Sequence, residues 1–584
     1  MAIKFGTSGV RGLVEEFTAD EVEKYVTAFL RHAERVASQP QDCELPGSSA
    51  REAESKAKTS AVAPGEGKTS EATPSQNETT VSPSKTKRQK VYLGMDRRES
   101  SPEIALKVLR TLQTNGYEFE YHGQVPTPCL ANYSIRHGGL GIVVTGSHVP
   151  ADRNGIKFYL PSGETLKPDE AGIEALAQTV ATGHASDTNA KPLANTNCKT
   201  KTNANASAKP STDTDSTTNT EGNTKLTTQN HSDQEAHGAA WLAQATKILA
   251  HPRPEAEDEY VARYLDFFKG GNFTGCRVLL YEHSAVGSKI LSRILEVLGC
   301  EVIRRGYSAK FVPVDTENLE NLAMLKDWVL NENADFLVST DGDSDRPLIV
   351  DDRGQVLRGD QIGMLLAQFL RIEYLAVPVS TLSSVSTLPS FKKVLLTRIG
   401  SPYVIEGMRQ LMREYPQGVV AGFEANGGFL LASPVTLRGK TLGALETRDA
   451  VLPIVGLIAH CREQGRALSE LRHQLPARFS GSSLIKPVPG DAAQQIIAEA
   501  AAQPGPFARD YLPFMKSPVC GFSALDGARF TFANGEVIHL RQSGNAPEFR
   551  CYSEADDEAA AQHLSELALN TLAELRQLKI NKLN

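Results

Sequence analysis

The sequence predicts an α/β protein of several domains, followed by an α+β module at the C-terminal end. Short β-rich runs alternate with helical patterns along most of the chain, which is typical of α/β units with largely parallel sheets. Near the C-terminus the order changes, because two strand-like runs flank Asn534-Gly535, a strong hairpin turn, before a final helix. At roughly 100–200 residues a domain, a chain of 584 residues has room for several domains.

The expected elements follow from the spacing of apolar residues. Residues 20–36 repeat apolar side chains at helical spacing and predict one amphipathic helix. Short apolar runs at 91–94, 141–144, 277–281 and 336–338 predict buried strands. Residues 260–367 and 377–475 each have the pattern of an α/β unit. In the C-terminal part, 528–532 and 536–540 predict the hairpin strands, and 556–578 predict the last helix.

Two stretches are too poor in apolar residues to fold. Residues 37–90 contain only Leu45, Val62 and Val81 from the large apolar set, and residues 183–238 contain only Leu193 and Leu226. Neither stretch can bury enough apolar surface to offset the entropy of ordering its backbone, so we expect both to be disordered insertions. A partner-binding tail is the alternative. Gly65-Glu-Gly-Lys-Thr imitates the end of a P-loop, but position 62 is not glycine and no strand precedes it.

Composition excludes several classes of protein. The chain has 62 Lys and Arg residues and 69 Asp and Glu residues, a net charge of −7. It lacks the dense block of basic residues that is typical of a nucleic-acid-binding protein, so we expect no nucleic-acid partner. The N-terminus has no uninterrupted apolar core of signal-peptide length, and the most apolar later stretch, residues 451–459, is too short to span a bilayer. We therefore expect a soluble, cytoplasmic protein with no membrane partner. The eight cysteines form no C-x-x-C pair and indicate neither a zinc site nor a disulfide framework.

The first candidate site segment is a loop after the strand at 141–144, Thr145-Gly-Ser-His-Val-Pro-Ala-Asp-Arg-Asn-Gly-Ile-Lys. Ligand crevices form at the carboxyl ends of parallel strands, and there Ser147 follows a glycine and precedes His148. The pattern is not the G-x-S-x-G elbow, so acyl-transfer hydrolase chemistry is not favoured. A plain turn serine is the alternative.

The second segment, Asp341-Gly-Asp-Ser-Asp-Arg-Pro, lies between two predicted strands. Alternate spacing lets three carboxylates converge on one hard cation, and without a cation their charges would repel. An EF-hand loop also begins D-x-D-x-D, but it needs glycine where this chain has Arg346. We expect a metal site, with an acidic surface turn as the alternative. Mg²⁺ is expected in preference to Ca²⁺, because three carboxylates leave coordination positions for a phosphate oxygen and water.

Two further segments could bind a substrate. Gly422-Phe-Glu-Ala-Asn-Gly-Gly places a carboxylate and an amide between glycines, which suits a polyol or, equally, a hairpin turn. Arg541-Gln-Ser-Gly-Asn-Ala-Pro-Glu-Phe-Arg combines a guanidinium, a hydroxyl and backbone amides, which suits a phosphate or a surface turn.

Taken in order, these segments resemble the α-D-phosphohexomutase superfamily, the phosphoglucomutases and phosphomannomutases. The resemblance begins at Gly6-Thr-Ser-Gly-Val-Arg-Gly and continues through the four segments above. Secondary matches lie between them, at Gly94-Met-Asp-Arg-Arg-Glu-Ser-Ser, Gly123-Gln-Val-Pro-Thr-Pro, Gly359-Asp and Gly400-Ser-Pro-Tyr. Together they cover the whole chain except the two insertions.

The resemblance implies four domains around a central cleft, three α/β domains with mixed or parallel sheets and a C-terminal α+β domain. On this chain, domain I would cover residues 1–175 with the phosphoserine loop, and domain II residues 239–372 with the metal loop. Domain III would cover residues 373–478 with the sugar-binding loop, and domain IV residues 479–584 with the phosphate-binding loop.

The resemblance also implies the chemistry. A phosphoserine, here Ser147, would give its phosphate to a sugar monophosphate, and the resulting hexose 1,6-bisphosphate would turn over and return the other phosphate. The Mg²⁺ ligands would be the phosphate on Ser147 and the carboxylates of Asp341, Asp343 and Asp345. Phosphoryl transfer also needs cations around the transferring group.

The remaining residues carry over by position. Arg11, Arg346 and Lys157 would supply positive charge, and the general acid–base at the sugar hydroxyl stays open between Lys157 and His148. Glu424 and Asn426 would hold sugar hydroxyls. The non-reacting phosphate would be held by Arg541, Ser543, Gly544 and Asn545.

Departures from the commoner family motifs bear on the substrate. The serine loop has His-Val-Pro in place of His-Asn-Pro, and the sugar loop has Asn426 where many members have serine. The phosphate loop has Gln542 in place of proline. This combination looks most like a phosphomannomutase, with phosphoglucomutase and phosphoglucosamine mutase as alternatives. A catalytically silent sugar-phosphate-binding regulator and a phosphatase are the alternatives of another class. The expected partner is a small phosphosugar, and the oligomeric state stays open.

Overall fold

The computed structural model describes residues 3–6, 9–38, 88–180, 240–317, 319, 321–543 and 548–576. Residues 1–180 and 252–584 form one unit, and residues 181–251 form a second, of which the structure describes 240–251. Several predicted features lie outside the described residues: most of insertion 37–90, the P-loop-like run at Gly65, all of insertion 183–238, and the loop residues Gly544 and Asn545.

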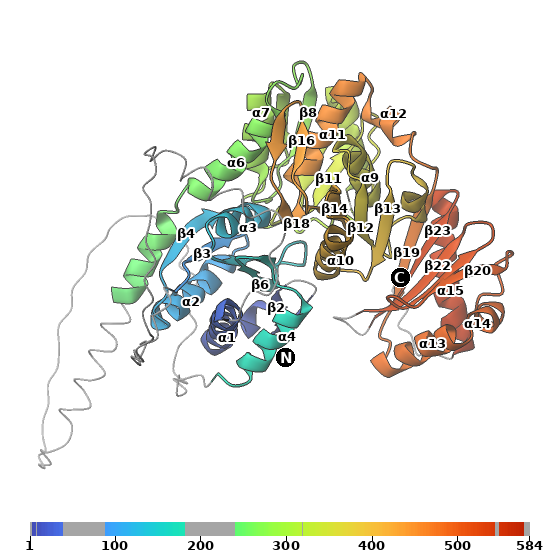
Figure 1. The fold of residues 1–584 in the computed structure, drawn as a ribbon, viewed down its shortest axis with the longest axis horizontal. Helices are drawn as coiled ribbons and strands as arrows, with labels where there is room; N and C mark the ends of the chain where they lie inside the picture. Colours follow the sequence, from blue (N-terminus) through green and yellow to red (C-terminus); the bar gives the residue numbers. More distant parts are fainter. Residues whose placement is uncertain are drawn as a thin grey trace, which may run out of the picture. The chain divides into compact units, whose positions relative to one another are not determined.

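The first sheet is mixed and carries strands in the order β1-β2-β6-β5-β3-β4, with β7 paired to β6. Figure 1 labels β2, β6, β3 and β4 of this sheet. The strands are β1 Lys4–Phe5, β2 Val10–Leu13, β3 Val91–Met95, β4 Phe119–Gln124, β5 Leu140–Val144, β6 Arg153–Leu160 and β7 Gly163–Glu164. Strand β3 is parallel to β4 and β5, whereas β6 is antiparallel to β5 and β2. The helices are η1 Val14–Glu16, α1 Ala19–Ser38, α2 Ser101–Thr114, α3 Thr127–Arg136 and α4 Lys167–Ala177.

The second sheet has the order β11-β10-β8-β9. Its strands are β8 Arg277–Tyr281, β9 Glu301–Arg305, β10 Phe336–Thr340 and β11 Pro347–Val350, and its helices are α6 Glu255–Phe268, α7 Ser288–Leu298 and α8 Leu322–Glu332. Strands β9, β8 and β10 are parallel and only β11 is antiparallel. The turn between β10 and β11 therefore carries the predicted metal loop.

The third sheet has the order β13-β12-β14-β15-β18, beside a two-stranded β16-β17 ribbon. The strands are β12 Tyr374–Pro378, β13 Lys393–Thr397, β14 Val420–Phe423, β15 Phe429–Leu431, β16 Val435–Leu437, β17 Lys440–Leu442 and β18 Leu445–Asp449. The helices are α9 Gly359–Phe369, η2 Ser383–Thr387, α10 Ser401–Glu414, α11 Val451–Gln464 and α12 Leu468–Arg472. Helix α11 contains the apolar run at 451–459 and packs against α9.

The fourth sheet is wholly antiparallel, in the order β19-β23-β22-β21-β20. Its strands are β19 Phe479–Ile485, β20 Val519–Ser523, β21 Ala528–Phe532, β22 Val537–Gln542 and β23 Phe549–Ala555, and its helices are α13 Gly490–Ala502, α14 Pro504–Tyr511 and α15 Glu558–Leu575. Helix α15 packs on β19 and β23. The C-terminal part is therefore an α+β module, as the sequence predicts.

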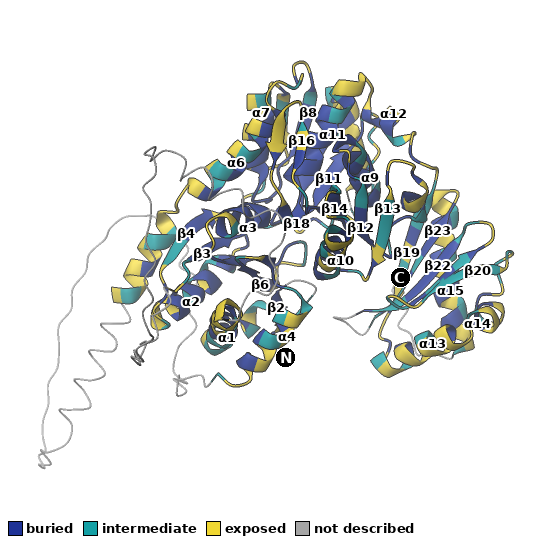
Figure 2. Ribbon diagram, in the orientation of Figure 1, coloured by how far each residue is buried: buried dark blue, intermediate teal, exposed yellow. Residues whose placement is uncertain are grey.

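The hydrophobic core is continuous across the first three sheets. One buried cluster joins Leu130 of α3, Tyr264 of α6, Leu366 of α9 and Ile458 of α11. The fourth sheet has its own cluster, built around residues such as Phe530 and Leu569. Figure 2 shows the central strands as buried and the outer helix faces as exposed. In the described part of the chain, no helix is both long and apolar enough to cross a bilayer.

The predicted elements are present with small shifts at their ends. The strands expected at 91–94, 141–144, 277–281 and 336–338 are β3, β5, β8 and β10. Helix α1 continues to Ser38, so Ala37 and Ser38 at the start of the first predicted insertion are helical. The second hairpin strand begins one residue later than expected, at Val537, because Glu536 still belongs to the turn after Asn534-Gly535.

Candidate active site

Ser147 lies in the loop that follows β5, at the carboxyl end of a central strand. The residue is 1% exposed, and its φ of 55° places it in the left-handed region. A residue other than glycine adopts that region at a cost of about 1–3 kcal/mol, and such strain is concentrated at functional sites. The geometry therefore favours a functional serine over a plain turn residue.

Arg98, which the sequence analysis did not single out, holds the Ser147 loop in place. Its guanidinium contacts Gly146 so closely that a Cβ at 146 would lie 2.6 Å from Arg98 Cζ, which explains the glycine before the serine. The same guanidinium donates to Asp96 Oδ2 at 3.2 Å. It also donates to the carbonyl oxygens of Ser147, Val149, Pro150 and Arg153 at 2.9, 2.6, 2.7 and 3.0 Å.

The three predicted metal-binding carboxylates converge in the turn between β10 and β11. One oxygen from each of Asp341, Asp343 and Asp345 lies within 4.8 Å of the others, and all three residues are buried. The turn lies against the serine loop, because a Cβ on Gly342 would lie 2.8 Å from the Ser147 carbonyl oxygen. The Ser147 hydroxyl donates to Asp341 Oδ2 at 2.5 Å. The serine and the triad therefore form one site.

Hydrogen bonds fix one oxygen of two of these carboxylates and leave the other oxygen without a donor. Lys157 Nζ donates to Asp343 Oδ2 at 2.6 Å and to Asp345 Oδ2 at 2.7 Å. The Thr127 hydroxyl also donates to Asp343 Oδ2, at 2.5 Å. Asp343 Oδ1 and Asp345 Oδ1 are buried and accept no hydrogen bond from the described residues. Such buried carboxylate oxygens are the ligands that Mg²⁺ takes, so the residues fit this metal.

The strand order brings the cations of the first sheet to the same place. Arg11 and Lys157 lie on the neighbouring strands β2 and β6, and β6 pairs with β5, which leads to Ser147. Desolvation, followed by the like charges of Arg346 and Arg448, lowers the pKa of Arg11 to about 10. Against the effect of its own burial, Asp343 and Asp345 raise the pKa of Lys157.

The remaining groups around Ser147 carry strongly shifted pKa values. His148 Nδ1 lies 3.4 Å from Ser147 Oγ. The positive charge of Arg346, followed by burial and Arg11, holds the pKa of His148 far below its ordinary value, so its ring is neutral. Burial, followed by the charges of Asp343 and Asp345, raises the pKa of Asp341 well above its ordinary value. Like charges of this kind call for a cation between the carboxylates.

The predicted sugar loop is the turn between β14 and β15. Gly427 adopts a φ of 86°, which explains a glycine at that position. Glu424 and Asn426 are buried, and Asn426 Oδ1 accepts from the Gly428 amide at 3.0 Å. The segment is therefore a hairpin turn, and the sugar-loop hypothesis applies to this same turn.

Arg448 on β18, which no sequence motif indicated, joins the sugar loop to the metal loop. It donates to Glu424 Oε2 at 2.9 Å and to Asp345 Oδ2 at 2.9 Å. The one signal in the sequence is a charged Arg448-Asp449 pair directly ahead of the apolar run at 451–459. A buried arginine near the end of a strand departs from the apolar pattern of buried strands. Its guanidinium needs hydrogen-bond partners to offset the cost of burial.

The predicted phosphate loop connects β22 and β23. Arg541 Nε donates to Asp526 Oδ2 at 3.0 Å, and the Ser543 amide donates to the Glu548 carbonyl at 2.9 Å. Asp526 Oδ2 also accepts from the Ile399 amide, at 2.9 Å, so Arg541 is held next to the third sheet. Gly544 and Asn545 lie outside the described residues.

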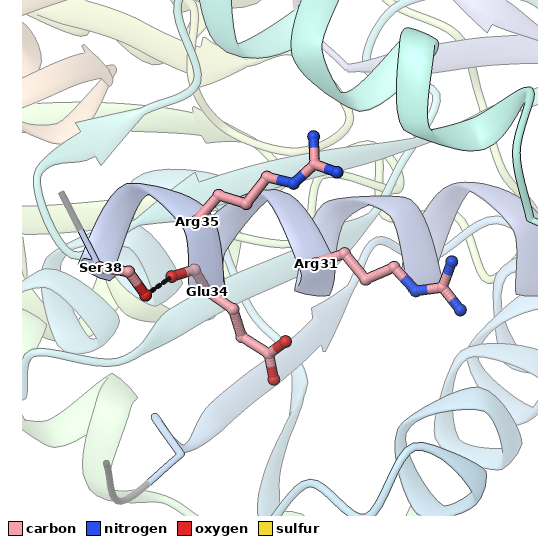
Figure 3. Close-up of a pocket in the computed structure, with 4 residues that line it drawn as sticks. All are labelled: Arg31, Glu34, Arg35 and Ser38. Atoms are coloured by element: carbon pink, nitrogen blue, oxygen red, sulfur yellow. Dashed lines mark hydrogen bonds between the residues drawn. The ribbon is translucent and has the colours of Figure 1, made fainter. Parts of the chain in front are cut away.

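A pocket elsewhere on the protein has none of these residues. It is lined along α1 by Arg31, Glu34, Arg35 and Ser38 (Figure 3). The Ser38 hydroxyl donates to the Glu34 carbonyl at 2.7 Å, a bond that Figure 3 marks with a dashed line. This pocket lacks any candidate nucleophile or metal triad and takes no part in the site built around Ser147.

Four regions of the chain match four domains of one family. Residues 76–184, 259–354 and 358–479 match phosphoglucomutase/phosphomannomutase alpha/beta/alpha domains I, II and III, and residues 492–570 match its C-terminal domain. The third match includes α9, which the boundary proposed after residue 372 assigns to domain II.

Curated relatives cover nearly the whole chain. A phosphomannomutase of Sinorhizobium fredii is 34% identical over 568 residues, 97% of each chain. A phosphomannomutase of Salmonella muenchen is 32% identical over 574 residues, 98% of this chain and 95% of its own. A phosphoglucosamine mutase of Solidesulfovibrio magneticus is 25% identical over 509 residues, 84% of this chain and 90% of its own.

Solved structures show the same fold. A phosphoglucomutase/phosphomannomutase family protein of Burkholderia thailandensis superposes with a TM-score of 0.63 at 16% identity, over 98% of each chain. The phosphoprotein pp63/parafusin of Paramecium superposes with a TM-score of 0.55 at 14% identity, over 98% of this chain and 93% of its own. From the four domain matches and the two relatives above 30% identity, the chain belongs to the phosphoglucomutase/phosphomannomutase family, the α-D-phosphohexomutases.

Proposed function

We propose that this protein interconverts mannose 6-phosphate and mannose 1-phosphate, with Ser147 as phosphoryl carrier and Mg²⁺ as metal. One observation carries the proposal: Ser147 Oγ lies 2.5 Å from Asp341 Oδ2, at the edge of the three-carboxylate cluster. A phosphate on that oxygen would lie beside a divalent cation, as phosphoryl transfer requires. The phosphomannomutases among its relatives support the same activity.

In the first half of the proposed reaction, phosphorylated Ser147 gives its phosphoryl group to a free hydroxyl of a hexose phosphate. The bond from phosphorus to Ser147 Oγ breaks as the bond to the sugar oxygen forms. Mg²⁺, held by Asp341, Asp343, Asp345 and the phosphate of Ser147, would neutralise charge on the transferring group. The product of this half is a hexose 1,6-bisphosphate.

Different basic residues carry out proton transfer, orientation of the triad and stabilisation of the phosphoryl group. We assign proton transfer to His148, whose Nδ1 lies 3.4 Å from Ser147 Oγ. It would take the proton of the attacking sugar hydroxyl and pass it to Ser147 Oγ as the phosphoryl group leaves. Lys157 orients the triad, since its ammonium donates to two of the three carboxylates. Arg11 and Arg346 provide fixed positive charge for the oxygens of the phosphoryl group.

The second half requires the bisphosphate to turn over and return its other phosphate to Ser147. Glu424 and Asn426 hold the sugar hydroxyls, and the loop of Arg541, Ser543, Gly544 and Asn545 holds whichever phosphate is not reacting. One phosphate-binding loop serves both halves, because substrate and product each present a phosphate there. Added hexose 1,6-bisphosphate acts as an activator because it can phosphorylate an unmodified Ser147.

The test is a mutase assay with Mg²⁺ and a trace of hexose 1,6-bisphosphate. Mannose, glucose and glucosamine 1-phosphates are compared, and we expect mannose 1-phosphate to turn over fastest. Ser147→Ala should lose about 10³-fold or more in kcat, the scale of losing a nucleophile. Ser134→Ala is the matched control, because this buried serine of the same domain donates only to the Ala131 carbonyl of its own helix.

Each other outcome points to a different conclusion. Full turnover by Ser147→Ala would refute the phosphoserine mechanism. Faster turnover of glucose or glucosamine 1-phosphate would identify the enzyme as one of the two alternative mutases. Release of inorganic phosphate in place of isomerisation would identify a phosphatase. Inactivity on all three sugars, with binding retained in a calorimeter, would identify a regulatory sugar-phosphate-binding protein.

A further inference from the structure

Arg448 connects two loops that come from different sheets. Its Nη1 donates to Glu424 Oε2 at 2.9 Å and to the Ser401 hydroxyl at 3.2 Å. Its Nε and Nη2 both donate to Asp345 Oδ2, at 3.1 and 2.9 Å. The side chain is 3% exposed, so these bonds form away from water. One guanidinium therefore fixes the orientation of a sugar-loop carboxylate and a metal-loop carboxylate at once.

The surrounding chain holds Arg448 from both sides. Its neighbour Thr447 donates to Glu164 Oε2 at 3.1 Å, and its neighbour Asp449 accepts from the Tyr260 hydroxyl at 2.7 Å. These partners lie on β7 and α6, outside the third sheet. The backbone at 448 is therefore anchored, and the guanidinium cannot follow one loop without moving away from the other.

The sugar loop leaves space for this side chain. A Cβ on Gly428 would lie 2.8 Å from both Cγ and Cδ of Arg448 and 3.0 Å from its Cβ. The φ of Gly428 lies outside the left-handed region, so its backbone does not require glycine. The absence of a side chain at 428 is explained by the arginine stem that passes there.

The bonds of Arg448 also decide which oxygen of Asp345 is free. Arg448 and Lys157 both donate to Oδ2, whereas Oδ1 is buried and accepts no hydrogen bond within the part of the chain that the structure describes. Partners of this kind orient metal-binding carboxylates, and their loss usually weakens metal binding by about 10–100-fold. Arg448 is thus placed to control the metal ligand from the sugar side of the site.

We propose that Arg448 is a positioning residue that couples the metal loop to the sugar loop, with Gly428 as the position that makes room for it. The proposal deepens the proposed function and rests on it for the identity of the sugar loop. A shift of the Glu424 carboxylate displaces the Arg448 guanidinium, which in turn changes the orientation of the Asp345 carboxylate. The coupling is reciprocal, because a coupling free energy between two sites acts equally in both directions. This coupling is additional to any direct contact between the metal and the phosphate.

The test is a double-mutant cycle on metal affinity, measured without substrate. Mn²⁺ serves as the probe, and its dissociation constant is read by electron paramagnetic resonance. Glu424→Asp keeps the negative charge but moves the carboxylate away from Arg448. Arg448→Lys keeps the positive charge but removes the guanidinium, which donates to Glu424 and Asp345 at the same time. We expect Glu424→Asp to weaken Mn²⁺ binding by about tenfold in the wild-type background, within the usual range for such partners, and by less than about twofold in Arg448→Lys.

Two further variants keep the test independent of folding and of activity. Gly428→Ala retains every charged group yet displaces the Arg448 stem, so it should also weaken Mn²⁺ binding. Glu446→Asp is the matched control, because Glu446 accepts from Arg409 at 2.9 Å in the same domain. It should leave the Mn²⁺ affinity unchanged, and a circular-dichroism melt of each variant checks the fold.

Equal effects of Glu424→Asp in both backgrounds, or no effect in either, would overturn the proposal. A kinetic measurement provides a second readout: Arg448→Lys should raise KM for the hexose phosphate and lower kcat together, whereas a purely structural role would lower only the fraction of active enzyme. The Mn²⁺ cycle needs no turnover, so an inactive protein with a coupled cycle would refute the proposed function and leave the coupling standing.

Discussion

Gly342→Ala tests whether the serine loop and the metal loop are as close as the structure has them. Gly342 lies between the first two carboxylates of the triad, and its φ is outside the left-handed region, so alanine meets no backbone strain there. The added Cβ would lie 2.8 Å from the Ser147 carbonyl oxygen and 2.9 Å from the Phe311 ring. Any loss of activity therefore reports on the contact between the loops.

The size of the effect follows from the distance. Ordinary contacts of a Cβ begin at 3.4 Å, so the loops must separate by 3.4 − 2.8, or about 0.6 Å. The Phe311 ring lies under the Arg98 guanidinium, with Cζ 3.9 Å from the ring centroid, and Arg98 also holds the Ser147 carbonyl at 2.9 Å, so neither neighbour of the new Cβ can yield freely. A misplacement of about 1 Å can cost about 10²-fold in rate, so about 0.6 Å should cost about tenfold or somewhat more in kcat.

The assay is the initial rate of mannose 1-phosphate isomerisation over a range of substrate and Mg²⁺ concentrations. KM should change less than kcat, because the described atoms nearest to a Cβ at 342 are the Ser147 carbonyl oxygen and the Phe311 ring, and neither belongs to the sugar loop. Gly443→Ala is the control, since among the described residues a Cβ at 443 would have only the Arg263 guanidinium nearby, at 3.8 Å. Wild-type kcat in Gly342→Ala, with an unchanged melting temperature, would refute the close approach of the two loops.

Two further predictions concern stability. Arg98→Met leaves Asp96 buried without its cation, so it should lower the free energy of unfolding by about 3–5 kcal/mol. A urea titration of the full chain would measure this loss, and a loss below about 1 kcal/mol would contradict the role of Arg98 in holding the Ser147 loop. Burial, outweighing the hydrogen bond from Lys167, raises the pKa of Glu170 to about 7, so the folded state binds this proton more tightly than the unfolded state. The resulting stability is complete below the unfolded pKa and is lost as pH rises through about 7. Melting temperatures between pH 4.5 and 8 should fall more steeply for wild type than for Glu170→Gln, and parallel curves would contradict the shift.

Much of the fold could be predicted because its strands are buried on both faces. β3, β5, β8 and β10 appear in the sequence as short continuous apolar runs, which is what burial under helices on both sides produces. Edge strands gave a weaker signal. β9 is an example, because its outer residues are charged and exposed, and nothing in its pattern distinguishes it from a loop.

The loops of the site could be predicted, but the residues that hold them could not. Ser147 and the three aspartates lie in short motifs of recognisable spacing. Arg98, Thr127 and Arg448 act through contacts across 49, 216 and 103 positions of sequence, so no local pattern reveals them. Arg98 and Thr127 lie within segments that resemble the family, although the sequence of those segments does not show what the two residues contact. Arg448 lies outside every segment that resembles the family.

These supporting cations complete a charge balance that the net charge of −7 conceals. The charged groups around the triad include four cations, Arg11, Lys157, Arg346 and Arg448, and four carboxylates, Asp341, Asp343, Asp345 and Glu424. These eight groups sum to zero when all are ionised, and the buried carboxylate of Glu164, which also acts on Arg448, adds one negative charge. A divalent cation alone would add two positive charges, and a phosphate on Ser147 alone would add nearly two negative charges. Under the proposed function, the two together would leave the net charge of the desolvated site nearly unchanged, which is a physical reason to expect the metal and the phosphoserine as a pair.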